Sequence, residues 1–378
     1  MFYILQWAYE PNTASENRIQ AYLRALNAMG TETTVVYLYP DKKYHKNPNS
    51  FANVHLVYYW NRFTPYRGFF RKLTFGLYIK RFLRNLQSGD AVYTYHINKL
   101  INYVQGISGV RTFAEMTEHP EASDGIDNPI LYISDAERTN IAKRLDGLFV
   151  ITEALRKYFV STGVEESKVH VINMIVDSSR FDGLVKSPNR ERYIAYCGNA
   201  SNNKDGVDEL IKAFALVAKR FKDIKLYIIG KKPGLDDNSG NLQLVRKLQI
   251  EDKVLFIGII PSSQIPQILV DAEILALDRP DSLQAQYGFP TKMGEYLLSK
   301  NPVVVTKVGD IPIFLHHKEN AMLAKERNAE EFANCICWLI ENTEQSKIIG
   351  MNGYETAMVY FNSNIETKKL NRVISLSM

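Results

Sequence analysis

Short apolar runs alternate with stretches of helical periodicity along most of the chain. Near its start, an apolar run at residues 2–6 precedes apolar positions spaced three and four apart between Ile19 and Met29, and residues 34–38 form a second apolar run. The two runs predict strands. The spacing between them predicts a helix that ends at Gly30, because glycine commonly terminates helices. A strand, a helix and a strand in this order predict a β-α-β unit with parallel strands.

The alternation is clearest after residue 190. Apolar positions between Val207 and Phe221 follow one face of a helix, and runs of strand length lie on both sides of it. The runs that predict strands are residues 193–197, 225–229, 254–257, 274–277 and 303–306. Strands separated by helices of this length predict a doubly wound parallel sheet, and such sheets bind ligands at the carboxyl ends of their strands.

A polar segment without periodicity lies between these two patterns. Residues 177–192 contain a proline and few apolar side chains, which is typical of a linker between domains. At 378 residues the chain is also longer than one ordinary core and suits two domains. We therefore expect a first domain over residues 1–185, a second over 186–355, and a C-terminal helix over 356–378 that packs back toward the first domain.

Composition narrows the class of protein. Hydrophobic residues make up 46% and charged residues 23%, a globular balance, and a net charge of +5 does not indicate a nucleic-acid partner. The three cysteines show no zinc-site spacing and predict reduced thiols in a cytoplasmic protein. We expect neither a signal peptide nor a spanning helix. The start lacks a basic leader, and no apolar run reaches the roughly 18 residues required.

Two loops of the second pattern suit an anion. In the first, Tyr-Gly-Phe-Pro-Thr-Lys at residues 287–292, Gly288 allows close approach of the backbone. Pro290 fits the first turn of a helix, whose free N–H groups bind anions. Lys292 and Glu295 share one face of that helix, so a simple surface salt bridge is the alternative. The candidate ligand-binding residues here are Tyr287, Gly288, Phe289, Pro290, Thr291, Lys292 and Glu295.

The second loop, residues 198–206, follows a predicted strand and consists mainly of small and polar residues. Lys204, near its end, could neutralise a diphosphate, although a lone lysine in a polar loop is often only solvated. The set of candidate ligand-binding residues is completed by Gly198 and Asn199 in this loop and by Gly230 at the end of the next predicted strand. Because both loops suit an anion and belong to one predicted sheet, a shared diphosphate ligand is favoured over the alternative that the loops have no common function.

The order of these segments resembles the retaining glycosyltransferases of family 4, the glycosyl transferases of group 1. The string from Gly288 to Thr306 carries most of the resemblance, and weaker matches end at Gly230 and Gly258 and cover residues 150–177. The resemblance implies an α/β GT-B fold, in which two Rossmann-like doubly wound domains face a central cleft. It also implies transfer of a sugar, of hexosyl type, from a nucleotide-diphosphate donor with retention of anomeric configuration.

The resemblance assigns roles to individual residues. Glu295 corresponds to the family's glutamate that binds the donor ribose, and Lys204 corresponds to its phosphate-binding lysine. Tyr287 stands where the family has a further glutamate, which alters recognition of the sugar hydroxyls, and Asn199 stands where it has an arginine. A full charge about 4 Å from phosphate gives roughly 4 kcal/mol gross at an effective dielectric of about 20, and a helix end about half as much. We therefore expect Lys204 and the helix end to hold the diphosphate, with Lys292 supplying the missing charge.

The first domain offers candidates for the facing side of the cleft. Residues 111–116 predict a strand, and Glu118 and His119 follow it. The family often has an acidic residue or a histidine at such a strand end, so the resemblance makes both residues catalytic candidates together with Lys204. A polar turn is the alternative for this segment. The loop at residues 10–17 is expected near the acceptor.

No metal ion is expected to take part. The sequence contains no Asp-x-Asp, the usual metal-diphosphate motif of the other large glycosyltransferase fold. We therefore expect no cofactor, with a nucleotide-diphosphate sugar, foremost a UDP-sugar, as co-substrate. The alternatives are a GT-B-fold sugar-nucleotide epimerase and a non-catalytic protein that binds nucleotide sugars. A dehydrogenase is disfavoured because no Gly-x-Gly-x-x-Gly follows a strand.

Residues 66–84 have the most unusual composition in the chain. Arginine and lysine alternate there with apolar side chains, and the segment has no acid. This pattern predicts an amphipathic basic surface that contacts anionic lipid, and a solvated basic helix with an ordinary core face is the alternative. With a membrane as partner we expect a glycan or lipid-linked acceptor, a place on the inner face of the membrane, and a role in surface polysaccharide synthesis.

Overall fold

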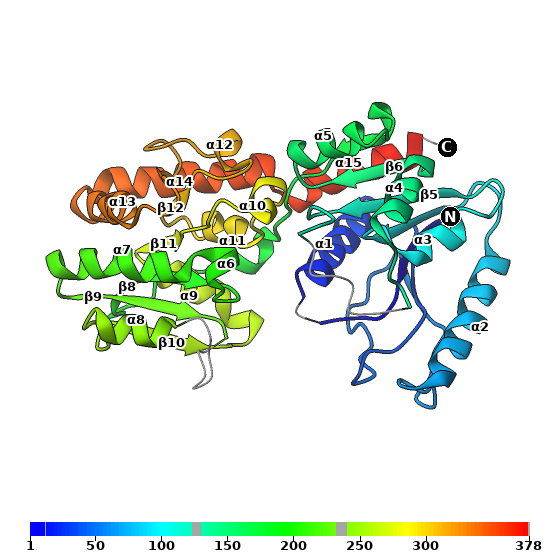
Figure 1. Ribbon diagram of the computed structural model, residues 1–378, viewed down its shortest axis with the longest axis horizontal. Coiled ribbons are helices and arrows are strands. Elements are labelled where there is room, and N and C mark those ends of the chain that lie inside the picture. Colours follow the sequence, from blue (N-terminus) through cyan, green and yellow to red (C-terminus); the bar gives the residue numbers. More distant parts are fainter. Residues whose placement is uncertain (12, 123–129, 232–239, 377–378) are drawn as a thin grey trace. The chain divides into compact units, whose positions relative to one another are not determined.

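The computed structural model describes residues 1–11, 13–122, 130–231 and 240–376. Its contacts divide the chain into two compact units (Figure 1): an N-terminal unit, Met1–Ile175 with Ser363–Met378, and a C-terminal unit, Val176–Asn362. Each unit is built on one parallel sheet with helices packed against it, so the expected α/β fold with two doubly wound domains is confirmed. No described helix combines the length and the apolar character that crossing a membrane requires.

The N-terminal unit contains a seven-stranded sheet in the order β3-β2-β1-β4-β5-β6-β7, in which all neighbours are parallel. The strands are β1 (Phe2–Gln6), β2 (Thr33–Tyr37), β3 (Val54–Tyr58), β4 (Ala91–Tyr95), β5 (Arg111–Met116), β6 (Gly147–Val150) and β7 (Val169–Val171). The helices are α1 (Ala14–Ala28), α2 (Phe69–Asn85), α3 (Lys99–Val104), α4 (Asp135–Arg144), α5 (Glu153–Ser161) and α15 (Ser363–Leu376). The predicted β-α-β unit is β1, α1 and β2.

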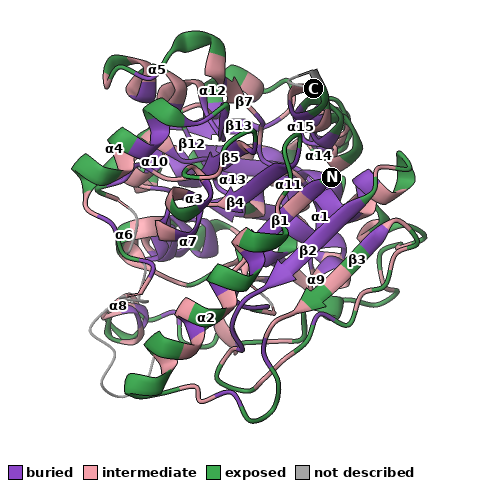
Figure 2. Ribbon diagram, turned by 90° about the vertical axis from the view of Figure 1, so that its right-hand side faces the viewer, coloured by how far each residue is buried: buried purple, intermediate pink, exposed green. Residues whose placement is uncertain are grey.

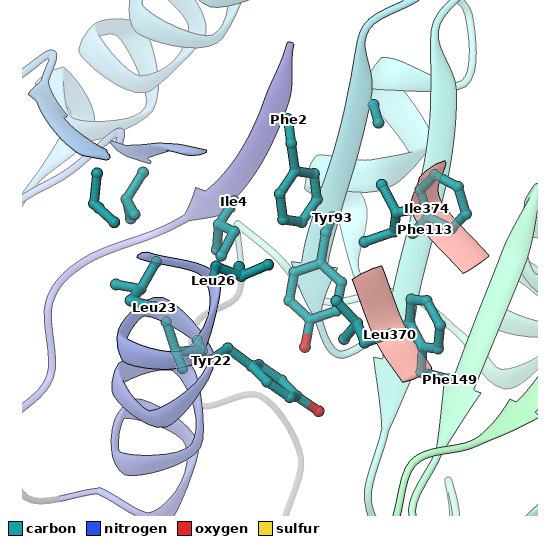
Figure 3. Packing of buried hydrophobic residues seen from close by; sticks show 14 of the residues in the cluster. Phe2, Ile4, Tyr22, Leu23, Leu26, Tyr93, Phe113, Phe149, Leu370 and Ile374 are labelled. Atoms are coloured by element: carbon teal, nitrogen blue, oxygen red, sulfur yellow. The ribbon is translucent and has the colours of Figure 1, made fainter. Parts of the chain in front are cut away.

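The core of the N-terminal unit combines distant parts of the chain (Figure 3). Tyr22 of α1, Tyr93 of β4 and Phe149 of β6 form a row in which neighbouring ring centroids are 6.3 Å apart. Leu370 and Ile374 of α15 belong to the same buried cluster. Because burying one such side chain contributes about 1.5–3 kcal/mol, the last helix is an integral part of this unit.

The C-terminal unit contains a six-stranded sheet in the order β10-β9-β8-β11-β12-β13, again parallel throughout. The strands are β8 (Arg192–Cys197), β9 (Ile224–Ile229), β10 (Val254–Gly258), β11 (Ile274–Leu277), β12 (Val303–Thr306) and β13 (Met322–Ala324). The helices are α6 (Asn202–Asp205), α7 (Val207–Arg220), α8 (Asn241–Lys247), α9 (Ile265–Asp271), α10 (Leu283–Tyr287), α11 (Lys292–Leu298), α12 (Ile311–Phe314), α13 (Ala329–Glu341) and α14 (Thr343–Tyr360). The strand order reverses between β8 and β11, which is where sheets of this kind bind ligands.

The segment that the sequence suggests as a linker lies on the C-terminal unit. Ser187 donates to the Asp271 carboxylate through its backbone N and its Oγ, at 2.6 and 2.8 Å, and Lys186 Nζ donates to Ala272 O at 3.1 Å. Hydrogen bonds to α9 thus explain the polar composition of this segment. The division between the units falls after Ile175, whereas we expected it after residue 185.

The C-terminal boundary also differs from the expected position at residue 356. Helix α14 continues past that position, and Phe361, just beyond it, packs against Phe289 with ring centroids 5.2 Å apart. The chain therefore leaves the C-terminal unit only after Asn362, and α15 begins at Ser363.

Candidate active site

Two glycines allow the loop after β8 to pack closely on its neighbours. A Cβ atom on Gly230 would lie 1.8 Å from Gly198 O, and Gly230 has a φ of 148°, a conformation that side chains disfavour. A Cβ atom on Gly198 would lie 2.5 Å from the Tyr196 hydroxyl and 2.7 Å from Lys292 Nζ. Both candidate glycines therefore stand where other atoms already occupy the space of a side chain.

Lys292 reaches across to this loop from the start of α11. Its ammonium nitrogen lies 2.6 Å from Asp205 Oδ2 and 5.3 Å from the centroid of the Tyr196 ring. The Tyr196 hydroxyl donates to the same Asp205 oxygen, also at 2.6 Å. The structure thus brings together the two loops that the sequence singled out. The alternative, a Lys292–Glu295 surface salt bridge, is not the pairing found, since Glu295 has a different partner.

The backbone of residues 198–206 is held from several sides. Ala200 N donates to the Tyr196 hydroxyl at 3.1 Å, and Ser201 caps α6 by accepting from Lys204 N at 3.3 Å. Gly206 ends α6 with a φ of 59°, and a Cβ atom there would lie 1.7 Å from Asp278 O. Lys204 therefore stands on a short helical turn that is fixed against the segment after β11.

Three cations share this region of the C-terminal unit. Burial lowers the pKa of Lys292, nearby Arg279 and Lys204 lower it further, and Asp205 opposes both effects. Arg279 is the second residue after β11, is 3% exposed, and donates from Nη2 to Gln284 O at 2.8 Å. The sequence analysis missed Arg279 and Asp205. For Arg279 a signal existed, because it comes just after a predicted strand, where such sheets bind ligands.

The turn before α11 separates residues that differ in exposure. Phe289 is buried, and its ring centroid is 5.6 Å from that of Phe314, so its side chain is part of the core. Pro290 is buried and Thr291 is exposed, and α11 begins at Lys292, so Pro290 precedes the helix and does not lie in its first turn as expected. The Phe289 side chain is thus not available to a ligand. Tyr287 is half-buried and Gly288 is buried, while Asn199 is exposed in the other loop.

Glu295 forms an ion pair with Arg180, which precedes β8 in the chain. Arg180 Nη2 also donates to Ser262 O at 2.7 Å. Burial raises the pKa of Glu295, Arg180 lowers it, and Asp177 raises it again. The expected ribose ligand Glu295 is therefore already held in one orientation by a guanidinium, a partner that sequence periodicity cannot reveal.

The candidates of the N-terminal unit lie beyond β5, where the sequence placed them. His119 is 5% exposed, its ring centroid is 4.3 Å from that of Tyr158, and its Nδ1 accepts from Glu121 N at 3.3 Å. Burial lowers the pKa of His119, so the ring is neutral near pH 7. Glu118 is half-buried. The catalytic candidates Glu118, His119 and Lys204 thus come from both units.

The segment expected as a loop at residues 10–17 enters helix α1 at Ala14, and the helical part contains a buried acid. Glu16 is 4% exposed, accepts from Gln20 Nε2 at 2.6 Å, and has a pKa that burial raises to about 7. Residue 12 of this loop lies outside the described residues. Glu16 is therefore a buried titratable group in this segment that the sequence analysis did not single out.

Comparison with known protein families finds a match over part of the chain. Residues 191–342, within the C-terminal unit, match the family model of the glycosyl transferases group 1, so the predicted resemblance is confirmed.

Two curated relatives match part of the chain. N-acetyl-alpha-D-glucosaminyl L-malate synthase of Bacillus anthracis is 26% identical over 157 residues, which are 42% of this chain and 38% of that protein. Mannosylfructose-phosphate synthase of Agrobacterium fabrum (strain C58 / ATCC 33970) is 22% identical over 231 residues, which are 57% of this chain and 50% of that protein. The chain spans half or less of the length of these curated relatives.

Solved structures match nearly the whole chain. Anabaena Alr3699/HepE in complex with UDP has a TM-score of 0.74 at 17% identity, with 99% of both chains covered. Sucrose-phosphate synthase from Thermosynechococcus elongatus has a TM-score of 0.74 at 15% identity, covering 99% of this chain and 98% of that one. These similarities establish the GT-B fold that the sequence implied.

Proposed function

We propose that this protein is a retaining, metal-independent glycosyltransferase of hexosyl type. Its donor is a nucleotide-diphosphate sugar, foremost a UDP-sugar, and its acceptor is a glycan or a lipid-linked glycan in surface polysaccharide synthesis. The observation that carries the proposal is the convergence of Lys204 and Lys292 at the carboxyl end of β8, beside the closely packed Gly198. The complex of Anabaena Alr3699/HepE with UDP, a protein of the same fold, supports the nucleotide.

The proposed reaction follows from the charges in the C-terminal unit. Breaking the anomeric bond of the donor leaves negative charge on the departing diphosphate, and Lys204 and Lys292 stabilise that charge in a preorganised site. No metal ion is needed in this scheme, since the countercharge comes from side chains. Glu295 accepts hydrogen bonds from the ribose hydroxyls, and Tyr287 lies near the donor sugar. In the N-terminal unit, Glu118 and His119 are the residues proposed to contact the donor sugar and the acceptor.

Binding and turnover test the proposal. Isothermal titration with UDP, UMP and uridine should show that the diphosphate contributes much of the binding affinity. A thermal-shift screen of UDP-, GDP-, ADP- and CMP-linked sugars identifies the preferred donor. Slow hydrolysis of the preferred donor without acceptor separates an enzyme from a non-catalytic binding protein. An isomerised nucleotide sugar as the sole product would identify an epimerase, and no affinity for any nucleotide diphosphate would overturn the proposal.

The second part of the proposal concerns a membrane partner for residues 66–84. Between Asp41 and Asp90 the chain has ten Lys and Arg residues and no Asp or Glu, although its net charge is only +5, so the rest of the chain is net acidic. This concentration of positive charge on one part of the N-terminal unit complements an anionic lipid surface.

Helix α2 has two apolar faces (Figure 2). One face is buried in the N-terminal unit and consists of Phe75, Ile79 and Phe82. The other face is exposed and consists of Phe69, Phe70, Leu73 and Leu77, with exposed fractions between 54% and 78%. A solvated basic helix needs only the buried face. The exposed apolar side chains beside Lys72, Lys80 and Arg81 therefore favour a peripheral position on the inner face of a membrane, with the apolar residues among the lipid headgroups.

A further inference from the structure

The Asp205 carboxylate is fixed between a phenol and an ammonium group. It is 2% exposed, and its Oδ2 lies 2.6 Å from both the Tyr196 hydroxyl and Lys292 Nζ. The chain turns at Gly206 directly after it, in a conformation that leaves no room for a side chain. Such a buried carboxylate with two short polar contacts has little freedom to move.

The partner of Asp205 occupies an unfavourable place for a cation. Lys292 Nζ lies 2.7 Å from the position that a Cβ atom of Gly198 would take, so the ammonium is against the backbone at the end of β8. Burial, Arg279 and Lys204 all lower the pKa of Lys292, whereas Asp205 raises it. Burial raises the pKa of the Cys197 thiol to about 12, that of the Tyr196 hydroxyl well above its usual range and that of Asp278 to about 8, so these groups are neutral near pH 7. Glu295, one turn further along α11, is paired with Arg180. Asp205 is therefore the group that opposes loss of the proton.

We propose that Asp205 is a positioning residue of the diphosphate site, which keeps the Lys292 ammonium charged and in place before the donor arrives. The inference rests on the proposed function, since it requires that Lys292 binds the donor diphosphate. A diphosphate brings its own negative charge and would stabilise the ammonium once bound. What Asp205 contributes is a charged lysine in the free protein, so that donor binding needs no proton uptake.

The inference differs in a measurable way from a purely structural ion pair. Without Asp205, the buried Lys292 loses its proton at a lower pH in the free protein, and each bound diphosphate must then be accompanied by one proton. At pH values above this lowered pKa of Lys292, linkage makes the affinity for the diphosphate fall up to tenfold per pH unit. A structural pair predicts weaker binding by the same factor at every pH.

The test measures UDP affinity from pH 6.5 to 9.0 for the full chain. We expect a shallow pH dependence in the original protein and a steep loss with rising pH in Asp205→Asn. The double variant Asp205→Asn/Lys292→Arg should restore the shallow profile, because a guanidinium stays charged throughout this range. Asp252→Asn, at an exposed position between α8 and β10, is the matched control and should leave the profile unchanged. A uniform loss of affinity in Asp205→Asn, or a steep profile that Lys292→Arg does not restore, would overturn the inference.

A second measurement needs no variant at position 205. Titration of the original protein with UDP at pH 8, in buffers of different ionisation enthalpy, counts the protons taken up on binding. We expect uptake near zero, and uptake of about one proton that disappears in Lys292→Met contradicts the inference. If the original protein binds no nucleotide diphosphate at all, the proposed function fails, which is a separate outcome.

Discussion

The Arg180 guanidinium pairs with the Glu295 carboxylate, and thereby joins the segment before β8 to helix α11. Arg180 lies in the short 3-10 helix Ser178–Phe181, and its second nitrogen donates to Ser262 O at 2.7 Å. Since burial raises the pKa of Glu295 and Arg180 lowers it, the ion pair helps to keep the proposed ribose ligand charged.

Replacing Arg180 by methionine should make nucleotide binding more sensitive to acid. Without the guanidinium the pKa of Glu295 rises, so the carboxylate takes up a proton at a higher pH and loses strength as an acceptor for ribose hydroxyls. When UDP affinity is measured between pH 4.5 and 8, the pH below which affinity falls should be about one unit higher in Arg180→Met than in the original protein. Arg190→Met, which removes a guanidinium that contacts Asp271 O, serves as control. An unchanged value of this pH in Arg180→Met would count against a ribose role for Glu295.

Arg279→Met should weaken UDP about tenfold, a loss of about 1.4 kcal/mol. The loss should be small for uridine, because the missing charge acts on the diphosphate and not on the nucleoside. Isothermal titration with UDP, UMP and uridine measures the difference, and Arg246→Met at an exposed position of α8 is the control. Equal losses for UDP and uridine would mean that Arg279 supports the fold of the site and not its charge.

Asp278 should make the folded state less stable as the pH rises. Its carboxyl is 1% exposed and has no hydrogen-bond partner among the described residues. Burial, followed by Glu209 and Asp208, raises its pKa from 3.8 to about 8. The folded state therefore holds a proton that the unfolded chain releases, so this contribution is lost between about pH 4 and pH 8, at up to about 1.4 kcal/mol per pH unit.

Urea unfolding at pH 5 and pH 8 tests this linkage. Asp278→Asn cannot ionise, so its midpoint should exceed that of the original protein at pH 8 by more than at pH 5. Asp281→Asn, at an exposed position nearby, should show no such change. The same difference between Asp278→Asn and the original protein at both pH values would show that Asp278 is not protonated in the folded state.

The exposed face of α2 should direct the protein to anionic vesicles. In flotation with phosphatidylcholine alone or mixed with phosphatidylglycerol, binding should require the anionic lipid and fall as salt rises. Leu73→Glu should lower bound protein several-fold, because it places a charge among the apolar side chains. Ile259→Glu, at an 83% exposed apolar position of the C-terminal unit, is the matched control. Equal binding of both variants would exclude α2 as the contact surface.

The periodicity of the sequence predicted the C-terminal sheet more completely than the N-terminal one. The predicted run at 193–197 overlaps β8 and the run at 303–306 coincides with β12, because these strands are buried on both faces and read as continuous apolar runs. Strand β3 alternates buried with more exposed positions, and β13 has only three residues. Neither leaves a run that stands out from its surroundings.

Sequence reasoning found one side of each interaction in the candidate site. Lys204 stood out because its loop follows a predicted strand, and Lys292 because it follows the Gly-Phe-Pro turn into a helix. Their environment depends on side-chain pairs between distant segments, such as Lys292 with Asp205. Polarity alone was misleading between residues 177 and 192, where hydrogen bonds to α9 and to Ala272 hold the segment within the C-terminal unit.

The inclusion of Leu370 and Ile374 in the buried cluster beside Tyr93 has a consequence for biosynthesis. Residues 1–175 are translated before α15, so this segment lacks part of its hydrophobic core until α15 has been made. The unit begun second is continuous in the chain and has all of its residues earlier. Deleting α15 would thus harm the N-terminal unit, most of which is translated before the C-terminal unit.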